Sequence, residues 1–405
     1  MNRLYVRMAR MLPFVVGLVC LGCDALMTEK SVAGNDFESP LEDMSRELNM
    51  VFLLGDENFE KVFTPAAGLG PIFNNTSCAG CHPGDGRGTP ELSFFRFSRT
   101  DDLALDLGGP QHQDKSLPGV PVEQVPEGVS RSFRLPPPVF GVGLIEAIPV
   151  EVILANADPE DADGDGISGR PNWVEPPSFV PSHHIGGGPG LQLGRFSRKG
   201  QVSSLIEQVS AAYQQDMGIT SDFIPEENSH RQVAGGIALG DGVPDPEIPA
   251  HIVLETTAYV RLLTPPARGR LTADVERGEA LFTQVGCTGC HVPTLRTGDS
   301  PIPQLNHIDA ELYSDLLLHD MGAELADGRN DGDATGREWR TAPLWGTRLV
   351  AEFLDGEEYY LHDGRATTLH DAIIQHGGEA QTAREAYSGL SAADQQMLVS
   401  FLKSL

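Results

Sequence analysis

The sequence predicts a mainly α-helical fold in which two similar halves are joined by long loops, with little β-strand. Three observations predict it. The pentapeptide Cys-x-x-Cys-His occurs twice, at residues 78–82 and 287–291. Apolar residues at helical spacing precede the second pentapeptide and close both halves. Stretches rich in glycine and proline, at 108–129 and 176–190, indicate long loops rather than strands.

The second half has the clearer helix pattern. Residues 274–282 place apolar side chains at helical spacing and run into the second pentapeptide. Ser391 suits an N-cap, and the apolar residues from Met397 to Leu405 predict a closing helix after it. The first half has looser counterparts, with Phe59 before its pentapeptide and a helix over 251–263 at its end.

Thr264-Pro265-Pro266 breaks the chain between the two halves. We therefore predict an export signal at 1–22, a linker at 23–45, an N-terminal domain at 46–264 and a C-terminal domain at 265–405. A chain of 405 residues has room for two domains of ordinary size.

Each pentapeptide is the signature of c-type haem attachment. Two thiols with two residues between them can each bond to one vinyl group of a porphyrin, and the next residue offers its imidazole to the iron. A lone Cys-x-x-Cys also suits a zinc site or a redox pair, but histidine follows both copies, and the further clustered ligands of a zinc site are missing. The sequence thus predicts two cytochrome c-like domains. The cofactor-binding residues are Cys78, Cys81, His82, Cys287, Cys290 and His291.

The N-terminus predicts export. Three arginines by residue 10 precede an apolar stretch at 11–21 that is too short to span a bilayer. Leu21-Gly22-Cys23 resembles a bacterial lipobox, which predicts a lipid anchor at Cys23 on the periplasmic side of a bacterial membrane. Cys20 stands where that pattern usually has leucine, so cleavage without lipidation is the alternative. Export agrees with c-type haem, which bacteria attach outside the cytoplasmic membrane.

The formal net charge of −28 argues against nucleic acid as a partner and against electrostatic binding to an anionic membrane. Such a charge favours cationic partners, for example the basic face of a small redox protein that donates or accepts electrons. An acidic surface that only keeps the protein soluble is the alternative.

Many phrases of the sequence, in one order, resemble the di-haem oxidoreductase family of peroxidases, whose members are sometimes described as thiol oxidoreductases. The resemblance covers most of the chain from residue 58 onward. One departure is Ser197-Arg198, where the family pattern has Gly-Trp. The phrases lie at 69–74, 143–149, 165–170, 216–221, 315–322, 339–346, 361–366 and 376–380.

The resemblance, which extends more distantly to bacterial di-haem cytochrome c peroxidases, implies a division of labour. A low-spin C-terminal haem would pass electrons to a reactive N-terminal haem, where an oxidant such as hydrogen peroxide binds. The alternative is a di-haem electron-transfer cytochrome without peroxidase activity. A third possibility, oxidation of a protein or organic substrate, is not distinguished from peroxidase action by the sequence.

A low-spin haem needs a second axial ligand, commonly methionine or histidine. Met217 and Met321 each stand in an Asp-Met-Gly segment, one per half, and Met321 is the stronger candidate. His362 is the competing candidate. In the distant peroxidases a residue next to the His-Asp-Gly segment supplies the ligand. Here that neighbour is Leu361, whose side chain cannot bind iron. Core methionines and a hydrogen-bonded loop histidine are the alternatives.

Two carboxylate features complete the candidate sites. Glu146 lies in an apolar run and is the candidate acid–base residue for peroxide cleavage, with a structural ion pair as the alternative. Asp161, Asp163 and Asp165 have the spacing of a calcium loop, with Gly166 at its sixth position. That loop lacks the glutamate expected at position twelve, and acidic turns are common without metal. The carboxylate spacing nevertheless makes Ca²⁺ a second predicted cofactor, with an acidic turn without metal as the alternative.

Overall fold

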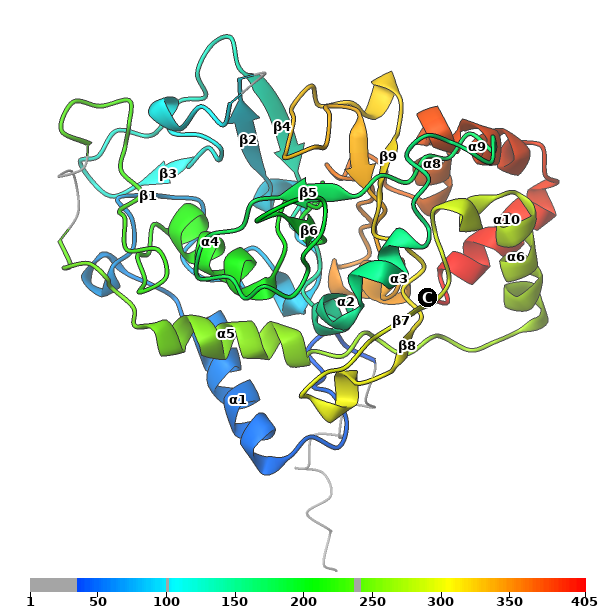
Figure 1. Cartoon of the computed structure of the whole chain (residues 1–405), viewed down its shortest axis with the longest axis horizontal. Helices are drawn as coiled ribbons and strands as arrows, with labels where there is room; N and C mark the ends of the chain where they lie inside the picture. Colours follow the sequence, from blue (N-terminus) through cyan, green and yellow to red (C-terminus); the bar gives the residue numbers. More distant parts are fainter. Residues whose placement is uncertain (1–34, 100–101, 237–241) are drawn as a thin grey trace, which may run out of the picture. The chain divides into compact units, whose positions relative to one another are not determined.

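The described part of the chain comprises residues 35–99, 102–236 and 242–405, all within one compact unit of this computed structural model (Figure 1). Helix accounts for 34% and strand for 12%, which confirms the prediction of a mainly α fold. The helices are α1 (Arg46–Glu60), α2 (Val142–Ala147), α3 (Val150–Leu154), α4 (Leu205–Met217), α5 (Ala250–Leu262), α6 (Ala273–Gln284), α7 (Val350–Phe353), α8 (Leu369–Gln375), α9 (Gln381–Ser388) and α10 (Ala392–Leu402).

The strands form small antiparallel pairs rather than a continuous sheet. Every sheet in the described residues has only two strands. The pairs are β1 (Ile72–Phe73) with β3 (Lys115–Ser116), β2 (Phe94–Ser98) with β4 (Ser130–Arg134), β5 (Asn172–Val174) with β6 (Gln192–Gly194), β7 (Leu295–Arg296) with β8 (Asp309–Ala310), and β9 (Leu318–Asp320) with β10 (Glu338–Arg340).

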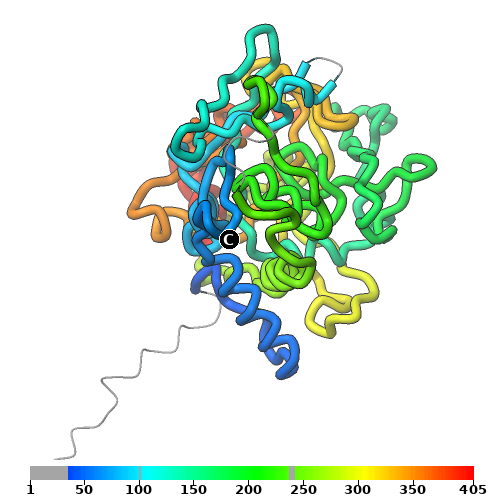
Figure 2. The backbone as a smooth tube through the Cα atoms, turned by 90° about the vertical axis from the view of Figure 1, so that its left-hand side faces the viewer, coloured from blue at the N-terminus to red at the C-terminus, as the bar shows by residue number. Residues whose placement is uncertain are grey.

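The two halves share one arrangement of helices. Helix α1 packs against α5 in the first half, and α6 packs against α10 in the second. The α1–α5 pair lies in the lower part of the molecule in Figure 1 and in the side view of Figure 2. Each opening helix carries a glycine at the crossing. A Cβ on Gly55 would lie 2.2 Å from the Glu255 carbonyl oxygen, and one on Gly278 would lie 2.1 Å from that of Met397.

Local sequence signals fix where these helices begin. The Thr272 side chain accepts a hydrogen bond from the Val275 N–H at the start of α6, and Ser391 does the same for Asp394 at the start of α10. The predicted closing helix after Ser391 is therefore confirmed, and α5 matches the predicted helix at 251–263 to within one residue.

The core consists of two hydrophobic clusters. The second surrounds the α6–α10 pair and includes Leu281, Phe282 and Phe401. The first includes Phe59 from α1 and Leu312 from beyond the predicted domain boundary. Side chains from both halves thus share one core, although the boundary residues 264–266 do lie between α5 and α6.

None of the helices in the described residues combines the length and the apolar composition that a bilayer crossing requires. The predicted export signal, Cys20 and Cys23 lie outside the described residues.

Candidate functional site

The first pentapeptide follows α1 and closes into a single turn. The His82 N–H donates to the Cys78 carbonyl oxygen at 3.0 Å, which brings both thiols and the imidazole to one short segment. Neither Cys78 nor Cys81 forms a disulfide. Cys81 is buried, and the Asn75 side-chain amide donates to its Sγ at 3.4 Å.

Carboxylates surround this first turn. Burial, and after it the Asp216 carboxylate, raise the pKa of the Cys81 thiol to about 12. Burial also raises the pKa of Asp216 to about 6 and that of Asp85 to about 7, and Asp85 accepts a hydrogen bond from the Tyr259 hydroxyl. Burial lowers the pKa of His82 to about 4, so its imidazole is neutral at pH 7. The Nδ1 atom of His82 is buried without a hydrogen-bond partner.

The second pentapeptide follows α6 and closes in the same way. A 3₁₀ turn over Cys287–Gly289 lets the His291 N–H donate to the Cys287 carbonyl oxygen at 3.0 Å. The His291 Nδ1 lies 2.8 Å from the Tyr313 carbonyl oxygen. A carbonyl oxygen can only accept, so Nδ1 carries the proton. Burial lowers the pKa of this imidazole to about 4, which leaves Nε2 with a free lone pair for a metal.

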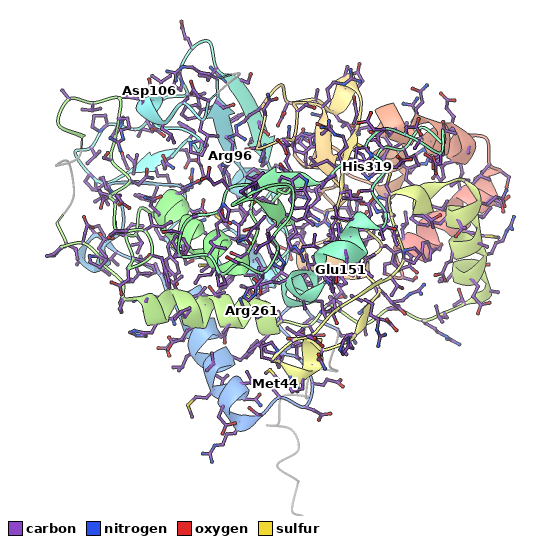
Figure 3. The ribbon with its side chains drawn as sticks, in the orientation of Figure 1. Met44, Arg96, Asp106, Glu151, Arg261 and His319 are labelled. Carbon is purple, nitrogen blue, oxygen red and sulfur yellow. The ribbon has the colours of Figure 1, made fainter. Side chains whose placement is uncertain are left out.

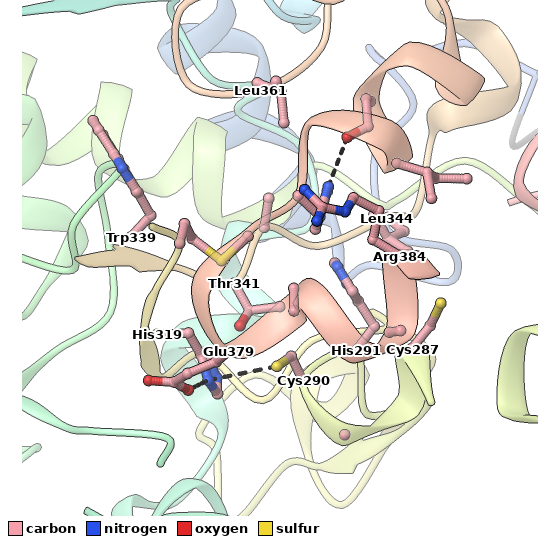
Figure 4. Close-up of a pocket in the computed structure, with 18 of the residues that line it drawn as sticks. Cys287, Cys290, His291, His319, Trp339, Thr341, Leu344, Leu361, Glu379 and Arg384 are labelled. Carbon is pink, nitrogen blue, oxygen red and sulfur yellow. Dashed lines mark hydrogen bonds and ion pairs between the residues drawn. The ribbon is translucent and has the colours of Figure 1, made fainter. Parts of the chain in front are cut away.

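A cavity of about 490 Å³ opens beside this second turn (Figure 4). Its size is that of a cofactor pocket, and most of its lining is apolar. Helices α6, α8 and α10 supply Phe282, Ala372 and Leu398 to the wall. The side chains that carry chemistry are Arg87, Asp165, Arg198, Cys287, Cys290, His291, His319, Met321, Trp339, Arg340, His362, His376, Glu379 and Arg384.

Two of the three predicted axial ligands line this cavity. Met321 and His362 both contribute to its wall. The His362 ring stacks on Trp339, with ring centroids 3.7 Å apart and an interplanar angle of 10°. Met217, in contrast, is the last residue of α4 and belongs to the first hydrophobic cluster. Its segment touches the first turn, because the Asp216 carbonyl oxygen accepts the Asn75 N–H at 3.0 Å.

Two further histidines line the cavity, and the sequence alone gave neither a role. His319, on β9 (Figure 3), has both nitrogens occupied, since Nε2 lies 2.8 Å from Asp315 and Nδ1 lies 2.8 Å from Glu379. Burial alone would lower the pKa of His319, but hydrogen bonds to Asp315, Cys290 and Glu379 outweigh it and raise the pKa to about 12. His376 lies 2.7 Å through Nδ1 from the Ala372 carbonyl oxygen, an arrangement like that of His291.

Glu146 is held by two contacts. Its carboxylate lies 2.6 Å from Arg261 Nε, at the end of α5 in Figure 3, and accepts the Leu205 N–H at 2.9 Å. Glu146 is not among the residues that line the cavity. This geometry is that of a structural ion pair, the alternative that the sequence left open, and the acid–base role stays a prediction.

The acidic loop gathers a different trio from the predicted one. Ligand oxygens of Asp158, Asp161 and Asp163 lie within 4.8 Å of one another. Asp165 instead accepts the Ile167 N–H at 2.8 Å and lines the cavity. The loop reaches the second turn through Ile167, which would be 2.5 Å from a Cβ on Gly289.

The comparisons with known proteins identify the family of the chain. Residues 19–100 and 116–405 match the family described as "Di-haem oxidoreductase, putative peroxidase". The chain belongs to this family, which makes it a di-haem oxidoreductase with haem as its cofactor. A search of curated proteins found no match.

Two solved structures are similar at low identity. The hydrazine synthase of Kuenenia stuttgartiensis, pressurised with xenon, is 18% identical with a TM-score of 0.39, over 98% of this chain and 100% of that chain. A MauG-like protein associated with microbial copper homeostasis is 16% identical with a TM-score of 0.41, over 89% of this chain and 90% of that chain.

Proposed function

We propose that this chain is an exported c-type di-haem peroxidase in which a low-spin C-terminal haem passes electrons, one at a time, to a reactive N-terminal haem. The observation that carries the proposal is the cavity beside the second turn. It brings the two free thiols of Cys287 and Cys290, the free Nε2 of His291 and the thioether of Met321 to one apolar space.

The side chains at both turns fit covalently attached haem. Each attachment adds one thiol S–H across one vinyl group, with sulfur bonding to one carbon and hydrogen to the other, so no external oxidant is needed. Burial raises the pKa of both Cys78 and Cys287, so these thiols are protonated at pH 7 and able to add in this way. His82 and His291 are neutral and can each serve as proximal ligand.

Haem iron, when bound, supplies the one-electron chemistry, and the chain's own groups divide the remaining tasks. In the second half, Met321 would complete the ligand set of the iron and exclude exogenous ligands; His362, stacked on Trp339, would be the competing ligand. In the first half, we assign Glu146 to accept and return the proton that peroxide cleavage moves between its two oxygens. Arg261 would hold the Glu146 carboxylate in place.

Calcium and the cellular setting belong to the same proposal. Asp158, Asp161 and Asp163 offer the hard oxygen ligands that Ca²⁺ prefers.

The net charge of −28 would steer a small cationic redox protein to the surface as electron donor. Lipidation at Cys23 would keep the protein on the periplasmic side of the membrane.

The test is EPR and optical spectroscopy of the purified holoprotein, oxidised and half-reduced, before and after hydrogen peroxide. We expect two haems per chain and, in the half-reduced state, one haem that is high-spin or that reacts with peroxide. Glu146→Gln should slow that reaction without changing the haem count. Two low-spin haems that ignore peroxide in every redox state would refute peroxidase action.

That negative outcome would support the second candidate, an electron-transfer cytochrome. Met217 favours it, because the Asp216 carbonyl oxygen, at the end of α4, accepts the N–H of Asn75, three residues before the first turn. If Met217 ligates the N-terminal iron as Met321 ligates the other, neither iron has an open face.

A further inference from the structure

The cavity beside the second turn contains guanidinium groups that form no direct ion pair with a carboxylate in the described residues. Arg87 donates from Nη1 to the Tyr359 carbonyl oxygen at 2.9 Å. Arg198 donates twice to the Leu135 carbonyl oxygen, from Nε at 3.1 Å and from Nη2 at 2.7 Å. Backbone carbonyls are dipoles and leave the full charge of each arginine in place.

Arg340 completes this group. Its Nε donates to the Ser197 carbonyl oxygen at 3.1 Å and its Nη1 to that of Thr341 at 3.0 Å. Like Arg87 and Arg198, it lines the cavity. In the described part of the chain, none of the three forms an ion pair with an aspartate or glutamate.

Arg198 lies close enough to the other two arginines for their charges to act on it. Burial, and after it the charges of Arg87 and Arg340, lower the pKa of Arg198 to about 9. Burial lowers the pKa of Arg340 to about 10. Half-buried cations that form no direct ion pair are stabilised by an anion placed between them, so the cavity is suited to an anionic group.

Two buried cations near the cavity differ from these three arginines, because each is paired with a carboxylate. Arg134 lies 2.5 Å from Asp331, and Lys199 lies 2.8 Å from Asp327, both pairs almost fully buried. The cavity has two lining carboxylates, but Glu379 is bound to His319 and Asp165 is bound to a backbone N–H. Arg134 and Lys199 beside the cavity are thus paired with carboxylates, whereas Arg87, Arg198 and Arg340 in its lining are not.

We propose that Arg87, Arg198 and Arg340 form a carboxylate cradle that binds the propionate groups of the haem attached at Cys287 and Cys290. Two propionates offset two of the three positive charges, and the flat guanidinium fork suits a carboxylate. Two of the arginines come from the first half of the chain and one from the second, so the bound haem ties both halves together. This inference rests on the proposed haem in this cavity.

The experiment compares Arg198→Gln and Arg340→Gln with Arg296→Gln, a surface control whose side chain is 56% exposed and paired with Asp309. Haem is counted first in each purified holoprotein. The midpoint potential of each haem is then measured by spectroelectrochemistry, and the propionate bending mode by resonance Raman spectroscopy. The redox step that disappears in Cys287→Ser/Cys290→Ser identifies the C-terminal haem.

We expect both cradle variants to lower the potential of the C-terminal haem and to shift its propionate mode, because loss of a nearby cation disfavours the reduced state. Arg296→Gln should change neither. Arg198→Lys, which keeps the charge, should restore the potential and also serves if Arg198→Gln does not fold. Unchanged potentials and modes in haem-loaded variants, or changes confined to the N-terminal haem, would overturn the cradle. A chain without haem at the second turn would instead refute the proposed attachment itself.

Discussion

The two Cys-x-x-Cys-His turns have the same backbone closure but different surroundings. At the first, the carboxylates of Asp85 and Asp216 lie nearby, and Nδ1 of His82 has no partner. At the second, Nδ1 of His291 donates to the Tyr313 carbonyl oxygen, and half-buried arginines line the adjacent cavity. The shared Cys-x-x-Cys-His pattern therefore does not make the two sites equivalent.

The difference in charge predicts an order of reduction. Nearby carboxylates stabilise an oxidised haem, whereas nearby cations stabilise a reduced one. The hydrogen bond to Tyr313 acts in the opposite sense at the second turn, because it makes His291 the stronger donor. We expect the three cavity arginines to outweigh that one bond. The first electron should thus reside on the C-terminal haem, as the proposed division of labour requires.

Removing one pair of thiols should have the largest effect. Cys287→Ser/Cys290→Ser and Cys78→Ser/Cys81→Ser should each reduce the covalent haem content from two to one per chain, as measured by pyridine haemochrome and intact mass. The first variant should lose the higher-potential redox step and the second variant the lower one. The reverse assignment would break the comparison of the two sites.

Replacing the methionines tests which iron has an open face. Met321→Leu should convert the C-terminal haem from low-spin to high-spin and lower its potential by on the order of 0.1 V, since axial ligands set haem potentials over a wide range. Met217→Leu is the matched variant and should leave both EPR signals unchanged. A new high-spin signal in Met217→Leu would instead favour the electron-transfer alternative.

The carboxyl of Asp85 predicts a pH dependence that belongs to the first turn alone. Its pKa is raised by burial to about 7, so the folded chain keeps a proton that the unfolded chain releases above about pH 4. Ionisation of this carboxyl therefore lowers the free energy of unfolding as pH rises from about 4 to about 7. Above that range the free energy of unfolding stays lowered.

Asp85→Asn should remove this cost. We expect the variant to exceed the wild type in free energy of unfolding by on the order of 4 kcal/mol at pH 8, with little difference at pH 4. Asparagine still offers an oxygen to the Tyr259 hydroxyl. Denaturant titrations at both pH values measure the effect, with Asp299→Asn as the control because that side chain is 99% exposed. An equal gain at both pH values would point to a cause other than ionisation.

Sequence patterns predicted the parts of this structure that depend on short-range signals. The opening and closing helices follow from apolar spacing, and Ser391 marks the start of α10 because its hydroxyl caps a local N–H. The closure of each pentapeptide is likewise local. For these elements the relevant partners lie within a few residues, where spacing carries information.

The asymmetry of the two sites depends on contacts between distant residues. Tyr313 binds His291 across 22 residues of loop, and Arg198 and Arg340 meet from different halves. Asp85 gives no sign in the sequence that it is buried. Calcium-loop spacing predicted Asp165, but the turn brings Asp158 into the cluster instead. No periodicity encodes such contacts, because the packing of irregular loops determines them.

Removal of calcium should have the smallest effect of these changes, and its spectral effect should be confined to the second turn. Ile167 follows the acidic loop and lines the haem cavity, and the Ser168 hydroxyl donates to Glu379 at 2.8 Å. With Ca²⁺ a few times above its Kd, binding would stabilise the fold by about 1 kcal/mol. Chelation should accordingly lower the Tm slightly and perturb the spectrum of the C-terminal haem, with no change at the other haem.

Two matched variants test which carboxylates take part. Asp158→Asn should abolish calcium binding in isothermal titration calorimetry, because Asp158 lies in the clustered trio. Asp165→Asn should bind nearly as well as the wild type, because its carboxylate lies outside the clustered trio. The opposite result would restore the trio predicted from spacing, and binding by neither the wild type nor the variants would leave the loop a plain acidic turn. A spectral response at the N-terminal haem would contradict the local coupling through Ile167.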